Sequence, residues 1–449
     1  MESLSFLLAI IFVSIVLIIL SANYLKVHPF FTLILACFFV GFCTGMNGEK
    51  IVITTSSGFG SILSGIGLIV VFGTIIGVYL ERSGALDAIA HSITSLMGSK
   101  RSISAMAILG AVVSVPVFCD SGFIILSKLS RILAEKRGIS SASMSLALAS
   151  GLYTTHTLIP PTPGAIAVAG NINMSDQLGI IVLTGLIVAI PVLFVCIFLA
   201  KRVGSKIEVE KLEYEASETN KYMHFLWASS PILVPITLIT ANSLLKFFEV
   251  PAYLSSTLTV IGHPLTALML GCILAMVQAL PRVPFKEQGA LFKTGIEQAG
   301  PILLITGAGG AFGAILKATP LEKLLTAQFD GASISFLLLL VLAFVIAAVL
   351  KTAQGSSTSA LVIGSSILAP FVLQSGVEHP FQLSLLIMAF GGGAMTVSHA
   401  NDSYFWVVTQ FSGFDMKGGY RGFSFMTFAQ GITTLLVVLA IYWVSQFFI

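Results

Sequence analysis

The chain has 449 residues, of which 56% are hydrophobic and 10% are charged, and its mean hydropathy is +0.98. This composition excludes a soluble domain and predicts an all-α polytopic membrane protein. The net charge of +3 is too small to suggest nucleic-acid binding. The five cysteines lie singly in apolar segments, which argues against a disulfide framework and against a metal site, so no metal or cofactor is expected.

Apolar runs of about 20 residues predict the spanning helices. The expected full spans of the first half lie near 3–22, 28–46, 61–80, 141–172 and 178–200. Those of the second half lie near 226–245, 260–280, 298–317, 382–409 and 423–447. A helical hairpin is expected in each half, at 102–135 and at 333–375. The more polar segments 47–60, 84–99 and 284–297 are expected to be interfacial helices.

A charged linker at 201–222 separates the two halves, 1–200 and 223–449, and is expected in the cytoplasm. Basic residues flank the first hairpin on both sides, beginning with Lys100 and Arg101 and ending with Lys136 and Arg137. Because basic residues gather on the cytoplasmic side of a membrane, both arms of this hairpin are expected to end there. Both termini are then predicted to lie outside, and the second hairpin enters the membrane from outside.

The two halves repeat at one constant offset. This offset places Gly73 and Gly77 on Gly309 and Gly313, and it places the first hairpin tip on the second. It also aligns the broken helix 141–172 with the broken helix 382–409. Each half has five full spans, an odd number, so the repeats must be inverted in the membrane. Inverted repeats with paired broken helices are typical of secondary transporters.

The tip of the first hairpin carries Asp120, Ser121 and Gly122 at membrane depth. Pro116 ends the helix before the tip, and Ser121 and Gly122 can begin the next one. Asp120 could simply cap that helix. Alternatively, it is a buried carboxylate that carries a proton or binds a cation, because an isolated charge at this depth is costly.

The second tip contains Lys351 followed by a run of small and polar residues: Gln354, Gly355, Ser356, Ser357 and Thr358. The glycine allows close approach of the backbone, and the hydroxyls lie beside a helix N-terminus, which favours a carboxylate ligand. The alternative is that small residues only allow tight helix packing. Lys351 could extend toward the interface, or pair with Asp120 or Asp402.

Two further breaks interrupt the helices. The first contains His156 and Thr162, and its three prolines remove backbone donors and leave carbonyls free. His156 could titrate near neutral pH or donate to a carbonyl. The second break contains His399, Asn401, Asp402 and Ser403, a polar string that is costly in a membrane unless it has a function.

Several motifs resemble the gluconate permease (GntP) family of the ion transporter superfamily, over essentially the whole length. They include H-P-F at 28–30, G-x-I-x-G-x-x-L-E-x-S-G-A at 73–85, H-T-L-I-P-P at 156–161, Q-G-S-S-T at 354–358 and D-S-x-F-W at 402–406. The resemblance implies a bacterial inner-membrane protein that imports sugar acids or other small carboxylates with protons. It also implies an elevator motion and a homodimer formed through a scaffold domain.

Two departures from the family pattern affect the expected site. Gluconate members usually have F-E-V-G where this chain has Phe118-Cys119-Asp120-Ser121-Gly122, and P-P-H-P-A where it has Pro160-Pro161-Thr162-Pro163-Gly164. Exchanging Glu for Asp and losing the histidine changes the groups that would contact the substrate. The substrate could therefore differ from gluconate.

The sequence thus predicts a transporter, not an enzyme, that imports gluconate or a related hydroxycarboxylate by proton symport. Asp120, Asp402 and His156 are the candidates for carrying the proton. The tips and breaks, with these three residues included, would also bind the substrate. The expected substrate-binding residues are Asp120, Ser121, Gly122, His156, Thr162, Gln354, Gly355, Ser356, Ser357, Thr358, Asn401, Asp402 and Ser403. The spans near 3–46 and 226–280 would form the scaffold. The alternatives are a sodium-coupled carboxylate or D-amino-acid transporter, and an intramembrane enzyme. The enzyme would use an Asp120–Asp402 dyad, but the G-x-G-D and H-E-x-x-H motifs are missing.

Overall fold

The computed structural model describes residues 4–447 except 24, 26, 99–100, 208, 210–222, 245–251, 321–323, 325–334 and 400–401. This part of the chain is entirely helical, with no strand in it. The all-helical prediction is therefore confirmed for the described residues. It follows from the composition, because a helix satisfies all its backbone hydrogen bonds internally within a membrane.

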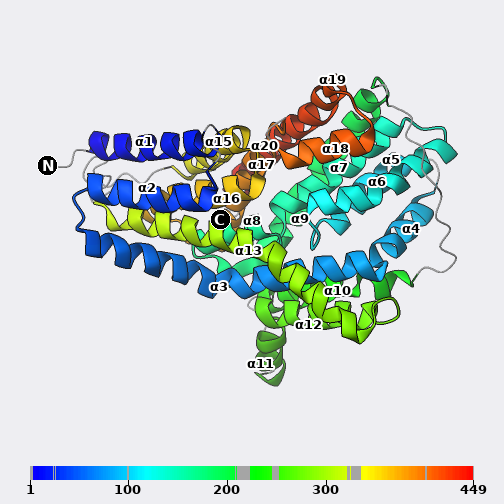
Figure 1. Ribbon diagram of the computed structural model, residues 1–449, viewed down its shortest axis with the longest axis horizontal. Helices are drawn as coiled ribbons and strands as arrows, with labels where there is room; N and C mark the ends of the chain where they lie inside the picture. The colour runs from blue at the N-terminus through cyan, green and yellow to red at the C-terminus, as the bar shows by residue number, and fades with distance from the viewer. Residues whose placement is uncertain are drawn as a thin grey trace.

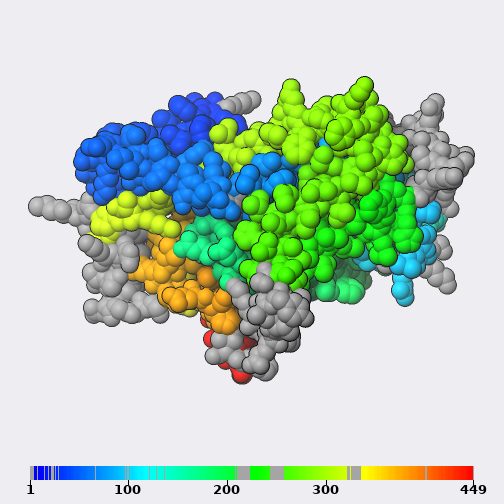
Figure 2. Space-filling model, turned by 90° about the horizontal axis from the view of Figure 1, so that it is seen from below, coloured from blue at the N-terminus to red at the C-terminus, as the bar shows by residue number. Residues whose placement is uncertain are grey.

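One group of helices comprises α1 (Leu4–Asn23), α2 (Pro29–Cys43), α3 (Gly48–Ser83), α4 (Ala85–Met97), α10 (Phe225–Leu244), α11 (Ala252–Ile261), α12 (Pro264–Ala279) and α13 (Phe285–Ala318). In this group, α1, α2, α3 and α13 run roughly parallel to one another, while α11 projects across their direction (Figure 1). Figure 2 shows α3 in blue beside the green α12 and α13 across one face of the molecule.

The other helices form two sets that pack against each other. The first set is α5 (Ser102–Val113), α6 (Cys119–Lys136), α7 (Ser141–Leu158), α8 (Pro163–Asn171), η2 (Ser175–Gln177) and α9 (Leu178–Gly204). The second is α15 (Phe336–Gln354), α16 (Ser357–Gln374), α17 (Pro380–Met395), α18 (Ser403–Ser412), α19 (Met416–Gly419), the π-helical turn η4 (Tyr420–Ser424) and α20 (Phe425–Ser445). In each set the first helix packs on the third, α5 on α7 and α15 on α17.

Six helices of the described part are long and apolar enough to cross a membrane, or seven when α3 is counted with its bend of 50°. Several other expected spans, including α2, α12 and α17, are shorter apolar helices. The helix expected at 141–172 is broken between Leu158 and Pro163, and the one at 382–409 between Met395 and Ser403. Both breaks lie where the sequence analysis expects them.

The expectation of separate interfacial helices at 47–60 and 284–297 is wrong. These segments are the first parts of α3 and α13, which pack along each other. The small residues within 47–60 permit this contact and do not end the helix. A Cβ built on Gly58 would lie 2.5 Å from Cβ of Ala314 and 2.9 Å from the carbonyl oxygen of Gly310. Only glycine allows the two helices to approach so closely.

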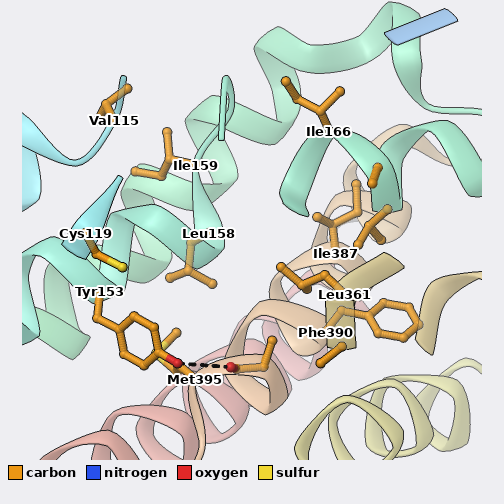
Figure 3. Close-up of a cluster of buried hydrophobic side chains, with 14 of the residues drawn as sticks. Val115, Cys119, Tyr153, Leu158, Ile159, Ile166, Leu361, Ile387, Phe390 and Met395 are labelled. Carbon is orange, nitrogen blue, oxygen red and sulfur yellow. Dashed lines mark hydrogen bonds between the residues drawn. The ribbon is translucent and has the colours of Figure 1, made fainter. Parts of the chain in front are cut away.

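The apolar core extends through most of the described helices and includes the contact between the first break and the second hairpin. Figure 3 shows Leu158 and Ile159 of the first break on the same cluster as Leu361 of α16 and Phe390 of α17. All four side chains are buried. Because close-packed apolar contacts fix neighbouring backbones relative to each other, these contacts hold the first break against α16 and α17.

Candidate functional site

The two hairpin tips and the two helix breaks surround one cavity of about 270 Å³. It is lined by Phe118, Cys119, Asp120, Tyr153, His156, Gln354, Gly355, Ser356, Ser357, Thr358, Asp402, Ser403 and Tyr404. These residues come from segments far apart in the chain. The structure therefore brings together most of the site residues that the sequence analysis selects.

The first tip presents Asp120 to the cavity. α5 ends at Val113 and α6 begins at Cys119, with Phe118 at the N-cap position and no side-chain cap. Asp120 thus lies inside the first turn of α6, where the helix dipole favours a negative charge. Its Oδ1 is buried and has no hydrogen-bond partner among the described residues. The carboxylate is therefore available for a ligand or a proton.

Gly122 of the same tip does not line the cavity. A Cβ at Gly122 would lie 2.8 Å from Cδ2 of Leu152, so this glycine allows α6 to pack closely on α7. The side chain of Ser121 lies outside the described part of the structure. Among the described side chains of the first tip, those of Phe118, Cys119 and Asp120 line the cavity.

The second tip begins with Gly355, which has a left-handed backbone (φ 79°) that favours glycine. Ser356 is the N-cap of α16, and its hydroxyl accepts a hydrogen bond from the amide of Ser359 at 3.2 Å. The Ser357 hydroxyl lies 2.7 Å from the hydroxyl of Tyr153. The hydroxyls of Ser356 and Ser357 thus already have partners within the protein.

The side chain of Gln354 differs from its neighbours in the second tip. Both its Nε2 and its Oε1 are buried and have no hydrogen-bond partner among the described residues. An unpaired buried polar group costs about 1–3 kcal/mol. An amide that faces a cavity at this cost is well suited to bind a ligand that both accepts and donates hydrogen bonds.

Lys351 and Asp402 form a buried ion pair. Nζ of Lys351 lies 2.5 Å from Oδ2 of Asp402 and 2.6 Å from the carbonyl oxygen of Gly355. The exposed fraction is 0% for Lys351 and 4% for Asp402, so the pair is screened from solvent. Of the partners that the sequence leaves open for Lys351, the structure selects Asp402. A buried pair of this kind needs such additional hydrogen bonds to offset its desolvation.

The first break contributes His156 to the cavity but not Thr162. The ring of His156 lies 5.9 Å from that of Phe118, and its Nδ1 is buried without a partner among the described residues. The Thr162 hydroxyl donates to the carbonyl of Ile159 at 2.8 Å. Thr162 lies on a neighbouring hollow that faces Gly73 of α3. Only the histidine of this break therefore reaches the cavity.

The second break contributes Asp402 and Ser403. Asp402 caps α18, because its Oδ1 accepts a hydrogen bond from the amide of Tyr404 at 3.0 Å. Asn401 lies outside the described residues. Nε2 of His399 is 2.9 Å from the carbonyl oxygen of Thr352, and this contact is exposed. Asp402 thus caps the N-terminus of α18 and also forms the ion pair with Lys351.

Two tyrosines that the sequence analysis does not select also line the cavity. The rings of Tyr153 and Tyr404 lie 5.2 Å apart, and the Tyr404 hydroxyl donates to the carbonyl of Ala149 at 3.0 Å. The sequence feature that could have identified them is a tyrosine in an apolar helix next to a predicted break.

Among the described residues, no group of three or more His, Cys, Asp or Glu side chains could hold a metal ion.

Comparisons with known proteins agree with the sequence motifs. A family model described as GntP family permease matches residues 6–444. An uncharacterised permease of Haemophilus influenzae is 33% identical, over 92% of this chain and 88% of that protein. The gluconate permease of Pseudomonas aeruginosa is 31% identical, over 95% of each chain. The D-serine transporter DsdX of Escherichia coli K12 is 28% identical, over 97% of this chain and 98% of that one.

Solved structures of other transporters share the fold. The YdaH transporter of Alcanivorax borkumensis has a TM-score of 0.70 at 15% identity, over 94% of this chain and 99% of that one. MtrF of Neisseria gonorrhoeae, described with a class of antimetabolite efflux pumps, has a TM-score of 0.62 at 13% identity, over 93% and 96%. These likenesses concern the fold alone. The family match over nearly the whole chain, together with relatives more than 30% identical, shows that this chain belongs to the GntP family of membrane permeases.

Proposed function

We propose that this chain is a secondary active transporter that imports a small organic anion together with a proton. The observation that carries the proposal is the set of unpaired buried polar atoms around one cavity. Asp120, His156 and Gln354 each present such atoms, and they come from three different interruptions of the helices. Other buried polar atoms of the described residues also have no partner, but these three residues converge on one cavity, where a bound ligand could satisfy them.

The chemistry of the cavity favours a short carboxylate that also carries a hydroxyl or an amino group. The N-terminus of α16 and the hydroxyl of Thr358 offer donors to a carboxylate. Asp120 needs a donor in return, which a hydroxyl or ammonium group would supply. Relatives named as a gluconate permease and as a D-serine transporter carry molecules of these two kinds.

The charges of the site favour coupling to a cation. Asp120 and Asp402 are acidic and Lys351 is basic, so the ionised site carries one net negative charge. A bound carboxylate would add a second negative charge in a region of low dielectric constant, which is costly. Binding a proton on Asp120 removes this cost. The anion and the proton would then bind together and cross together.

We further infer that the halves are inverted repeats that move as an elevator. The order of packing supports the repeat: α5 lies on α7 and α7 on α9, as α15 lies on α17 and α17 on α20. The moving part would contain these helices with α6, α8, α16 and α18. The halves proposed from the sequence, 1–200 and 223–449, each contain one such set, except that the last turn of α9 extends to Gly204 in the proposed linker.

An asymmetry in the glycine contacts supports the motion. A Cβ built on Gly77 of α3 would lie 2.8 Å from the carbonyl oxygen of Pro116, at the first tip. The equivalent Gly313 of α13 instead faces Ser366, well beyond the second tip. A hollow of about 380 Å³ also lies among α3, α8, α13 and α16, and Lys317 lines part of it. In the second state of such a transporter, the moving helices would slide until Gly313 of α13 contacts the second tip, as Gly77 of α3 contacts the first tip in this structure.

The test is transport by the purified protein in lipid vesicles. Candidate carboxylates are first screened by the rise in unfolding temperature that a ligand produces. Uptake of those that bind is then measured with an imposed inward proton gradient, with a sodium gradient, and with neither. Uptake driven by the proton gradient supports the proposal. If uptake needs a sodium gradient and does not depend on pH, the coupling ion is sodium and not a proton. If no small carboxylate binds, the proposed substrate class is excluded.

A further inference from the structure

A continuous series of hydrogen bonds joins α20 to the second tip through the second break. Oγ1 of Thr427 accepts from the amide of Ser398 at 3.0 Å. The Ser398 hydroxyl donates to Oδ2 of Asp402. Lys351 donates to the same carboxylate oxygen at 2.5 Å and to the carbonyl of Gly355 at 2.6 Å. The ammonium group is thus the link between the break and the tip.

We propose that the Lys351–Asp402 pair is a fixed strut that holds the second tip in its anion-binding shape, and that Asp120, not Asp402, is the carboxylate that carries the coupled proton. Lys351 is then a positioning residue, because it is completely buried and does not line the cavity. The part of this inference that concerns substrate and proton rests on the proposed function. The strut itself can be tested without any substrate.

The carbonyl of Gly355 explains how Lys351 acts on the tip. An unpaired carbonyl oxygen at the tip would be a partial negative charge next to a bound carboxylate, and it would repel that carboxylate. While it accepts a hydrogen bond from Lys351, the carbonyl is held by the ammonium group. The N-terminus of α16 then remains the group that the anion meets. Lys351 therefore strengthens binding of the anion without contacting it.

The hydrogen bonds of the two carboxylates distinguish their roles. Asp402 accepts from Lys351, Ser398 and the amide of Tyr404, so protonating it would disrupt a satisfied network and leave a buried ammonium unpaired. Asp120 has an unpaired oxygen in the cavity wall. The ionisable and charged groups that face Asp120 from its own helix and its neighbours are Cys119, Tyr153, His156, Lys351, Asp402 and Tyr404.

The strut is tested by a double-mutant cycle in the absence of ligand. Lys351→Met and Asp402→Asn are made singly and together, and the unfolding temperature of each protein is measured. Each single change leaves one buried charge or polar partner uncompensated, so each should lower the unfolding temperature by several degrees. The double change removes both charges and should recover most of that loss. If the unfolding temperature of the double variant falls by as much as the two single decreases added together, the pair does not interact and the proposed strut is wrong.

The transport arm uses gluconate and D-serine as probes in proteoliposomes. The double variant should keep the pH dependence of uptake, with KM raised about tenfold and kcat little changed, because the tip loses the hydrogen bond that holds Gly355. Asp120→Asn should lose the pH dependence. If the double variant loses it too, Asp402 carries a proton and the proposal is wrong. If the parent protein transports neither probe, the proposed function fails for these ligands, while the unfolding cycle still decides on the strut.

Discussion

The ammonium nitrogen of Lys351 lies 2.5 Å from Oδ2 of Asp402, although the two residues are 51 positions apart in the chain. This contact decides the electrostatics of the cavity. Asp120 and Asp402 line the cavity, and Lys351 lies behind its wall; Lys351 and Asp402 neutralise each other, which leaves Asp120 without a counter-charge. Asp120 is therefore the group at which a cation or a proton would compensate a bound anion.

Asp120→Asn should abolish uptake driven by a pH gradient but preserve counterflow exchange of substrate. The amide has nearly the same shape as the carboxylate but cannot bind the transported proton at this position. Asp87→Asn is a matched control, because Asp87 is an exposed carboxylate on α4 and does not line the cavity. The assignment is wrong if Asp120→Asn retains the pH dependence of the parent.

Thr358→Val should weaken substrate binding by about 1–2 kcal/mol, or roughly tenfold, since it removes a hydroxyl that lines the cavity and keeps the shape of the side chain. Thr358→Ser is the control that keeps the hydroxyl. Ser356→Ala should instead mainly lower stability, by about 1 kcal/mol, because Ser356 caps α16. Calorimetry on purified protein separates the two effects. If Thr358→Val binds substrate with the same affinity as the parent protein, the substrate carboxylate does not bind at Thr358.

Gln354→Leu should raise the stability of the ligand-free protein and weaken ligand binding. Both amide atoms of Gln354 are buried without a partner among the described residues, so the apolar side chain removes a penalty of about 1–3 kcal/mol. Gln288→Leu is the control with the opposite sign, because its amide donates to the carbonyl of Met276 at 3.2 Å. Unfolding temperatures with and without ligand provide the measurement. Loss of stability in ligand-free Gln354→Leu would contradict the proposed role.

Gly313→Cys with Ser366→Cys should form a disulfide that stops transport until it is reduced. A Cβ on Gly313 lies 3.7 Å from that of Ser366, within the range of about 3.5–4.5 Å found in disulfides. The equivalent pair of the other repeat is Gly77→Cys with Ser130→Cys. In this structure a Cβ on Gly77 meets the Pro116 carbonyl, so this pair should cross-link only in the second transport state, in which the two halves have exchanged their arrangements. Full transport by cross-linked Gly313→Cys/Ser366→Cys would argue against the sliding motion.

Lys136→Cys should be protected from an impermeant thiol reagent added to intact cells, whereas Glu378→Cys should react. The basic residues around the first hairpin predict that its ends lie in the cytoplasm. Both variants need a Cys43→Ser background, because Cys43 is exposed. Labelling of Lys136→Cys from outside would reverse the predicted orientation of the whole chain.

The sequence by itself determined where the hairpin tips and the two broken helices are interrupted, although not where α3 and α13 begin. Proline and glycine act on the backbone of their own segment, so the breaks near Pro116, Pro161 and Gly355 could be predicted locally. The apolar composition between them determined the helical class for the same reason. Family membership was also contained in the sequence, because the motifs extend over most of its length.

Only the tertiary structure decided which polar groups meet. Lys351 could have paired with Asp120 or Asp402, and helix packing across the core selected Asp402. Packing also placed Gly122 against Leu152, and it directed Thr162 to a hydrogen bond within its own break and away from the cavity. These outcomes depend on how helices distant in the chain approach each other, and that approach is set by the sum of many weak contacts, which no single segment encodes.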